Sequence, residues 1–201
     1  MVNGLDGFEI DKVYGYQING LTVETGDLIC TVDGNPSFLI GQFWWFVGKL
    51  IPGEVDQIVV YVGPKGRCVE AGARGKVITF SVPDHHWDAA SMFAQRNMMD
   101  RLYGIAYPLA QRGLSQKDVN RIRLDVAQYC LRQAKEGKPY NLNFQDADTE
   151  QAFYCSQLAY KAYIRPGINL NTEQGIPNIP FSRNIVFPAE VWNACNKRVR
   201  V

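Results

Sequence analysis

Three short strands separated by tight turns are predicted within residues 57–82, and this run restricts the fold more than any other feature of the sequence. Its first apolar stretch, Ile58 to Val62, is mostly β-branched, as buried strands commonly are. The turn "GPKGR" follows, and "CVEAG" and "GKVITFSV" continue as strands. Another strand is predicted over residues 20–32, entered through the turn "TGD". Short turns join strands in antiparallel order, so this part of the chain predicts an antiparallel sheet.

The second half of the chain has a helical pattern. Apolar residues recur at spacings of three and four over residues 87–111 and 117–135, which predicts two helices. A third helix is expected from Thr149 or Glu150 onward, and a short final helix over residues 187–199. We therefore expect an α+β fold in which a barrel-like antiparallel sheet of about five strands packs against the third helix.

The length of the chain favours a single domain. Its 201 residues, 46% of them hydrophobic, suffice for one core and are too few for two comfortable ones. We expect one domain over residues 1–201, with the helical pair at about residues 87–136 as an insertion on its outside. Twenty-one basic and twenty acidic side chains leave a formal net charge of +1 without a long basic run, which argues against nucleic-acid binding.

The sequence carries no evident membrane or secretion signal. Its longest apolar run, residues 38–51, is interrupted by Gly, Gln and Lys and falls short of the ~20 residues that a spanning helix needs. The N-terminus lacks a basic segment followed by an apolar one, so no signal peptide is predicted. The expected location is therefore cytoplasmic, and a mature secreted form stays open.

Cysteines and histidines are the residues that most often bind metals. The five cysteines stand at wide, irregular spacings without a C-x-x-C pair, so neither a zinc site nor a complete disulfide framework is predicted. Reduced thiols agree with a cytoplasmic protein. The two histidines, His85 and His86, are adjacent, and neither has an acidic residue four positions away. We predict no metal site and no cofactor.

Cys155 occupies the first turn of the third predicted helix. The unpaired backbone N–H groups and the positive end of the helix dipole favour a thiolate there, as a nucleophile requires. A second interpretation stays open, in which Cys155 is a small buried hydrophobe packed against Tyr154 and Leu158. The other four cysteines lie within apolar strands or helices and are expected in the core.

Several short motifs occur in one characteristic order along the chain. They are "GDLI" (26–29), "QIVVYVG" (57–63), "CVEA" (68–71), "PYNLNF" (139–144) and "FYCSQLAYKAY" (153–163). In this order they resemble the permuted, papain-like branch of the NlpC-type cysteine peptidase superfamily, the group that includes YiiX/YaeF-like proteins. The resemblance covers roughly residues 20 to 195 and implies a circularly permuted papain-like fold.

The resemblance also implies a catalytic set. Cys155 would be the nucleophile, Glu70 would orient the base, and a histidine would begin the strand "QIVVYVG" as that base. This sequence has Gln57 at that position. A glutamine amide has no usable basicity, so Gln57 cannot accept the thiol proton, although it can donate a hydrogen bond to an oxyanion.

Three explanations for Gln57 remain open. The protein is an inactive family member that binds without cutting, or its base comes from elsewhere, or the glutamine replaces a natural histidine. The alternative bases are His85, His86 and Glu70, the last only if burial raises its pKa by several units.

The leading functional prediction is a cysteine hydrolase that acts on an amide or ester through a thioester intermediate. The resemblance implies small cell-wall-type peptides with γ-linked or D-residues as substrates. The alternatives are an inactive ligand-binding relative and a lipid acyl hydrolase or acyltransferase. Tyr61 and Tyr154 are candidate substrate contacts, or else core residues, while Trp44 and Trp45 would form an apolar wall for an acyl group, or else a helix packed on the sheet.

Overall fold

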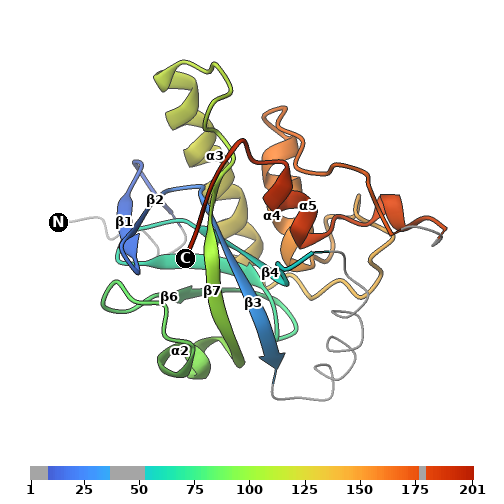
Figure 1. The fold of residues 1–201 in the computed structure, drawn as a ribbon, viewed down its shortest axis with the longest axis horizontal. Helices are drawn as coiled ribbons and strands as arrows, with labels where there is room; N and C mark the ends of the chain where they lie inside the picture. The colour runs from blue at the N-terminus through green and yellow to red at the C-terminus, as the bar shows by residue number, and fades with distance from the viewer. Residues whose placement is uncertain (1–8, 37–52, 177–179) are drawn as a thin grey trace.

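The computed structural model describes residues 9–36, 53–176 and 180–201 of the chain and shows an α+β fold built around a strongly curled antiparallel sheet (Figure 1). The sheet has six strands in the order β6-β5-β4-β3-β7-β8, and β1 pairs separately with β2. In chain order the elements are β1 (Gly15–Ile18), β2 (Leu21–Glu24), β3 (Leu28–Pro36), β4 (Gln57–Tyr61), β5 (Arg67–Ala71), β6 (Val77–Ser81), α2 (Ala89–Arg96), β7 (Met98–Tyr107), α3 (Gln116–Lys135), α4 (Cys155–Ile164), η1 (Ser182–Asn184), α5 (Pro188–Asn193) and β8 (Lys197–Arg200).

The long strand β3 lies at the centre of the sheet, between β4 and β7. Its pairing with β7 shifts register twice, between Cys30 and Thr31 and between Val32 and Asn35, and such irregularities bend a strand and increase its twist. On the other side, β4 pairs with β5 only through its last two residues. The backbone at the start of β4 is therefore open on the side of β5.

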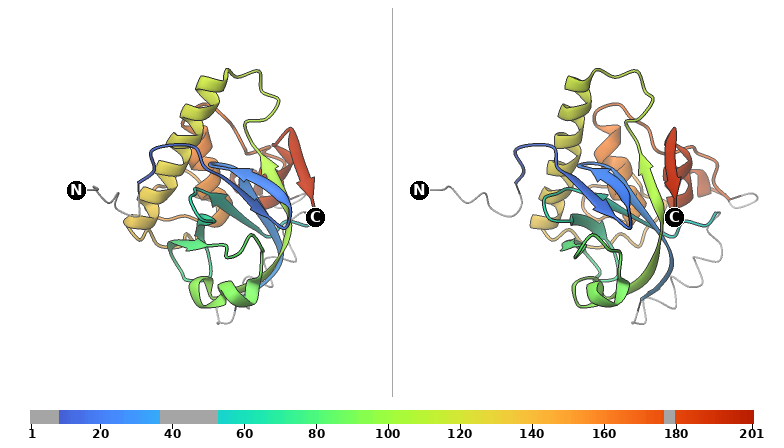
Figure 2. Two further views of the ribbon diagram at one scale, coloured as in Figure 1. Left: turned by 90° about the vertical axis from the view of Figure 1, so that its left-hand side faces the viewer. Right: turned by 60° about the vertical axis from the view of Figure 1, so that its left-hand side comes forward.

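Alternating side chains of the sheet enter two separate buried clusters. Leu28, Ile58 and Val60 join a cluster with α3 and α4, which we call the helical face. Ile29 and Val59 join a second cluster with the β1–β2 hairpin and α2, which we call the hairpin face. Figure 2 shows the hairpin in front of the sheet and the long helices behind it.

The predicted helix over residues 87–111 is wrong in its second half. Only α2 is helical there, and Met98–Tyr107 forms β7, so the two helices within residues 87–136 are a short α2 and the long α3, separated by a strand of the main sheet. Asn97 ends α2 because it adopts a left-handed conformation with φ 58° and returns its N–H to the carbonyl of Phe93. The chain then pairs with β3 and β8.

Three further boundaries also differ from the prediction. The strand predicted over residues 20–32 is two strands, β2 and β3, because the chain turns at Gly26 with φ 92°. The helix of Cys155 begins at Cys155 itself, and the predicted final helix is α5 followed by the edge strand β8. The strands β4, β5 and β6 and the helix α3 are confirmed.

Within the described residues, no helix combines the length and the apolar character that crossing a membrane demands.

Candidate functional site

Cys155 is the first residue of α4 and faces the open backbone at the start of β4. Its sulfur lies 4.0 Å from the carbonyl oxygen of Asp56 and 4.0 Å from Oγ of Ser156. The backbone N–H of Ile58 also hydrogen-bonds the sulfur. The residue is only 6% exposed. The thiol thus contacts β4 on both sides of Gln57 in the sequence, from within a nearly closed environment.

Buried polar side chains fix the start of α4. The backbone N–H of Tyr154 donates to Oε1 of Gln157, which also accepts a hydrogen bond from Nδ2 of Asn141. The hydroxyl of Ser156 donates to the carbonyl of Val186 at 2.7 Å. These bonds tie the first turn to two distant loops, so the position of Cys155 is well determined.

Burial dominates the acid–base behaviour of this thiol. Burial is the main cause that raises the pKa of Cys155 to about 11, against hydrogen bonds from Ile58 and Ser156 that lower it and with a smaller contribution from the charge of Glu70. The helix start therefore does not produce a thiolate at neutral pH. In this state Cys155 is a protonated thiol.

Gln57 and Glu70 are hydrogen-bonded to each other beside this thiol. Nε2 of Gln57 donates to Oε2 of Glu70 and to the carbonyl of Ala71, both at 3.2 Å. A Cβ atom at Gly72 would lie only 3.2 Å from Nε2 of Gln57, so the glycine leaves room for this amide. The structure thus brings Cys155, Gln57 and Glu70 to one corner of the sheet.

Glu70 is bound on its other side by a fully buried guanidinium. Nε and Nη2 of Arg96 donate to the two oxygens of Glu70 at 3.0 and 2.8 Å, and Nη1 and Nη2 donate to Asp100 at 2.7 and 2.8 Å. Thr31 and the indole of Trp87 donate to Asp100 as well. We call Glu70, Arg96 and Asp100 the Arg96 cluster. Because its hydrogen bonds go to Arg96 and Gln57, Glu70 orients position 57 and does not contact the thiol proton.

Both histidines lie on the hairpin face. The ring of His85 stacks on Tyr16 with centroids 4.1 Å apart, and its Nδ1 lies 3.1 Å from the carbonyl of Gln17. His86 is exposed in the same loop. The sheet separates this loop from α4, so neither imidazole is placed to accept a proton from Cys155.

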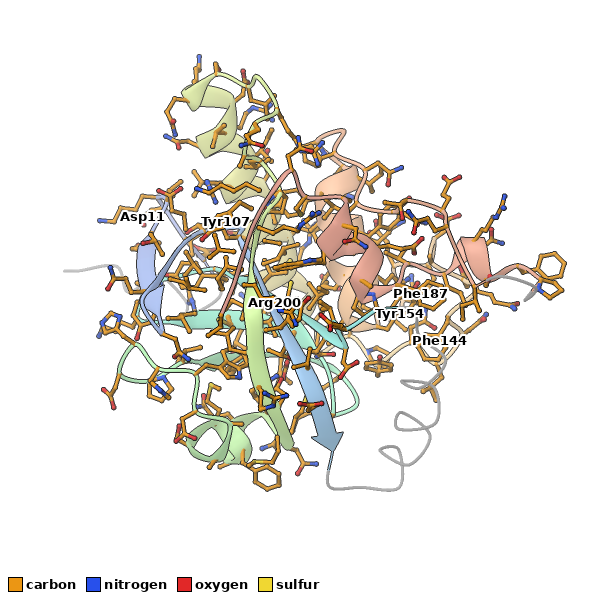
Figure 3. All side chains as sticks on the ribbon, viewed as in Figure 1. Asp11, Tyr107, Phe144, Tyr154, Phe187 and Arg200 are labelled. Atoms are coloured by element: carbon orange, nitrogen blue, oxygen red, sulfur yellow. The ribbon has the colours of Figure 1, made fainter. Side chains whose placement is uncertain are left out.

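Of the predicted substrate contacts, the two tyrosines are buried and the two tryptophans, Trp44 and Trp45, lie outside the described residues. Tyr61 belongs to the cluster on the hairpin face. The hydroxyl of Tyr154 accepts a hydrogen bond from the backbone of Val186, and its ring packs against Phe144, as Figure 3 shows. Tyr154 therefore joins loops together and does not present its hydroxyl to a ligand.

Tyr140, in the motif "PYNLNF", lies next to the start of α4. Its backbone bridges Phe153, just before Cys155, and its N–H donates to the carbonyl of Gly75. Burial, together with the charges of Cys155 and Glu70, raises the pKa of the Tyr140 hydroxyl. The backbone of Tyr140 therefore lies beside the residue pair that precedes α4. The motif "PYNLNF" was the available signal, but a loop motif does not reveal where its backbone will pair.

No family model, curated protein or solved structure matches the chain.

The chemistry of the site must therefore be judged from its own groups. Among the residues that the structure describes, no cluster of three or more His, Cys, Asp or Glu side chains is arranged to hold a metal ion. The corner offers a thiol, the N–H groups at a helix start, a neutral amide and a carboxylate that a guanidinium already binds. It can accept hydrogen bonds from a ligand and donate them, but within these described parts of the chain it lacks a neighbouring base.

Proposed function

We propose that this protein is a thiol-hydrolase-like binding protein that holds an amide- or ester-containing ligand at Cys155 without turning it over efficiently. One observation carries the proposal: the amide of Gln57, at the position where the sequence resemblance implies a base, is hydrogen-bonded to Glu70 at 3.2 Å. The resemblance implies the roles of nucleophile and acid for Cys155 and Glu70, and an amide at position 57 cannot serve as the proton acceptor.

The small fraction of deprotonated thiol and the lack of a proton acceptor explain why turnover would be slow. With a pKa of about 11, about one Cys155 thiol in ten thousand is deprotonated at pH 7. A neighbouring imidazole would form an ion pair with the thiolate and return the proton to the leaving group, whereas the amide of Gln57 does neither. The backbone N–H groups at the start of α4 could still donate hydrogen bonds to the carbonyl oxygen of a bound ligand.

The ligand class follows from the sequence resemblance. A small peptide with γ-linked or D-residues, as in bacterial cell walls, supplies the amide carbonyl that such a corner would hold. An acyl ester is the alternative ligand, and it depends on the predicted wall of Trp44 and Trp45.

The decisive experiment restores the base. We expect Gln57→His to gain hydrolysis of a muropeptide or acyl-ester panel, because general acid–base catalysis contributes roughly 10²–10⁴-fold. Gln57→Asn is the matched control, since asparagine is also a neutral amide, and it should stay inert. Adding Cys155→Ala to Gln57→His should abolish the gain. If Gln57→His remains inactive on every substrate, the hydrolase-like interpretation loses its support.

Alkylation measures the state of the thiol directly. We expect iodoacetamide to modify Cys155 about 100-fold more slowly at pH 7 than an ordinary thiol, because its pKa is raised by about two units, to about 11. Peptide mapping distinguishes Cys155 from the other four cysteines, all of which are fully buried. Rapid labelling of Cys155 at pH 7 would contradict the proposal.

A working thiol hydrolase is the second candidate. The hydrogen bond from Ile58 to the sulfur favours it, because this N–H stabilises a thiolate and partly opposes burial. In that case the unmodified protein would hydrolyse the same panel and Cys155→Ala would not. Activity of the unmodified protein that depends on Cys155 would select this candidate over the binding protein.

A further inference from the structure

A groove between α3 and α4 lies at the end of α4 opposite Cys155. The two helices lie side by side (Figure 1), and the groove between them has a volume of about 330 Å³. Arg121, Asp125, Tyr129 and Arg132 line it from one face of α3, and Arg165 lines it from the end of α4. The ten residues of α4 place it about 15 Å from Cys155, so it is separate from the proposed site.

The groove carries an excess of positive charge. Its lining has three guanidinium groups and one carboxylate. Arg121 pairs with Asp125 at 3.3 Å and with Asp118 at 3.5 Å, and Arg165 lies 3.6 Å from Glu150. Asp118 and Glu150 lie outside the lining. Arg132 has no carboxylate partner within the described parts of the chain. Its guanidinium therefore has donors available for an anion.

Tyr129 holds two of these guanidiniums in place. Arg165 and Arg132 lie over its ring, 5.2 and 5.6 Å from the centroid. Stacking of this kind engages the face of a guanidinium and leaves its N–H groups at the edge available. The two cations are therefore positioned before a ligand arrives, which lowers the entropy cost of binding it.

The hydroxyl of Tyr129 is an independent sign of a missing partner. The residue is 3% exposed, and its hydroxyl has no hydrogen-bond partner among the described residues. An unpaired buried hydroxyl is costly, and native structures usually satisfy such groups. An oxygen of a bound ligand would satisfy it.

We infer that this groove binds a small ligand with a phosphate monoester group. An anion suits a lining with three arginines, one of which, Arg132, has no carboxylate partner among the described residues, and arginine N–H pairs match phosphate oxygens in bidentate geometry. The volume lies at the lower end of the range of small-molecule pockets, which favours a small phosphate compound. The inference is independent of the function proposed for Cys155.

Calorimetric titration of the full chain tests the inference. Phenyl phosphate and inorganic phosphate are the probes. Succinate, a dicarboxylate, is the comparison ligand, and all three are measured at one ionic strength. We expect saturable one-to-one binding of the phosphate probes at pH 7, tighter than that of succinate. Binding should weaken at pH 5, because a phosphate monoester with a second pKa of about 6 then loses its second charge. No saturable binding, or tighter binding of succinate, would overturn the inference.

Variants locate the binding. Arg132→Gln and Arg165→Gln, both at exposed positions, should each weaken phosphate binding by about tenfold, because each removes charge-assisted hydrogen bonds. Arg101→Gln, an exposed arginine on β7 outside the groove, is the matched control and should bind as the unmodified protein does. Equal losses in all three variants would indicate a general charge effect and refute the site.

Tyr129→Phe separates binding from stability. If the hydroxyl meets the ligand, this variant binds phosphate more weakly, while its melting temperature without ligand is unchanged or higher because an unpaired buried hydroxyl has been removed. A lower melting temperature with unchanged binding would assign the hydroxyl a structural role and contradict its part in the site.

Discussion

Two buried arginines, Arg96 and Arg123, show how differently one protein can accommodate the same charge. Arg96 is fully buried, and all three of its nitrogens donate hydrogen bonds, shared between Glu70 and Asp100. Arg123 is also buried, on α3, but its Nε has no partner among the described residues. Its Nη1 bonds Asp27 and the carbonyl of Thr25, and its Nη2 pairs with an exposed Glu24.

The carboxylates that bind the two arginines also differ in the number of hydrogen bonds they accept. In the Arg96 cluster two acids share one guanidinium, which donates to all four of their oxygens. Neutral donors from Thr31, Trp87 and Gln57 add a second hydrogen bond to three of these oxygens. Among the described residues, the carboxylate of Asp27 accepts hydrogen bonds from Arg123 and from the backbone N–H of Glu24, and burial raises its pKa to about 6 despite both. Asp27 thus has fewer donors around it than either acid of the Arg96 cluster.

This comparison also bears on Gln57. The Arg96 cluster contains two carboxylates and one guanidinium, so it has an excess of one negative charge. A histidine at position 57 would be stabilised as a cation by that excess, which is the condition for a thiolate–imidazolium pair. The glutamine supplies the hydrogen bond to Glu70 without the charge.

Replacing each guanidinium gives the largest expected effect. Arg96→Met should lower the free energy of unfolding by about 3–5 kcal/mol, because two buried carboxylates lose their counter-charge. Arg123→Met should cost less, since it leaves one buried acid that already takes up a proton readily. Urea denaturation at pH 7 measures both variants. The comparison fails if Arg123→Met is as destabilising as Arg96→Met.

The pH dependence of stability isolates Asp27. The folded protein keeps the Asp27 proton up to about pH 6, whereas the unfolded chain releases it near its ordinary value of 3.8. Relative to Asp27→Asn, the unfolding free energy of the unmodified protein should therefore fall as pH rises from 4 to 6.5, by on the order of 3 kcal/mol.

Denaturation curves of both proteins across this pH range provide the measurement, and the difference between them removes the contribution of all other groups. A difference that stays constant with pH, or that grows as pH rises, would show that Arg123 fully compensates Asp27 and that the two arginine sites are alike.

The sequence predicted the elements whose signals are local. The β-branched run of β4, the tight turns after it and the cap of α3 by Ser115 all act within a few residues. β7 was missed because Met98, Leu102 and Ile105 fit a helical spacing as well as a strand. Its pairing with β3, about seventy residues earlier in the sequence, decided between them.

The candidate site was predictable to a similar degree. Position 57, Glu70 and Cys155 were selected through a sequence resemblance, and the structure brings them to one corner of the sheet. Arg96 was not predicted, because it lies 26 residues from Glu70 and no local pattern indicates which strand will meet the end of α2. The raised pKa of Cys155 was missed as well, since a helix start seen in sequence says nothing about burial.

The amide of Gln57 tests whether the neutral donors matter to the Arg96 cluster. Gln57→Met keeps the volume and removes the bonds to Oε2 of Glu70 and to the carbonyl of Ala71, while Arg96 still binds both oxygens of Glu70. We expect a loss of about 2 kcal/mol by urea denaturation, about 1 kcal/mol for each buried hydrogen bond. A loss comparable with that of Arg96→Met would mean that the neutral donors, and not the guanidinium, stabilise the buried charge.

Replacing an exposed arginine should have the smallest effect on the free energy of unfolding. Arg101 on β7 pairs with Asp33, and their side chains are 75% and 61% exposed. Water already solvates both ions, so Arg101→Gln should change the unfolding free energy by less than about 1 kcal/mol, and 0.5 M salt should reduce even that. The same denaturation assay as for Arg96→Met measures it. If Arg101→Gln and Arg96→Met cost equal amounts, burial is not what makes the guanidinium of Arg96 important, and the contrast between the two buried arginines would need another cause.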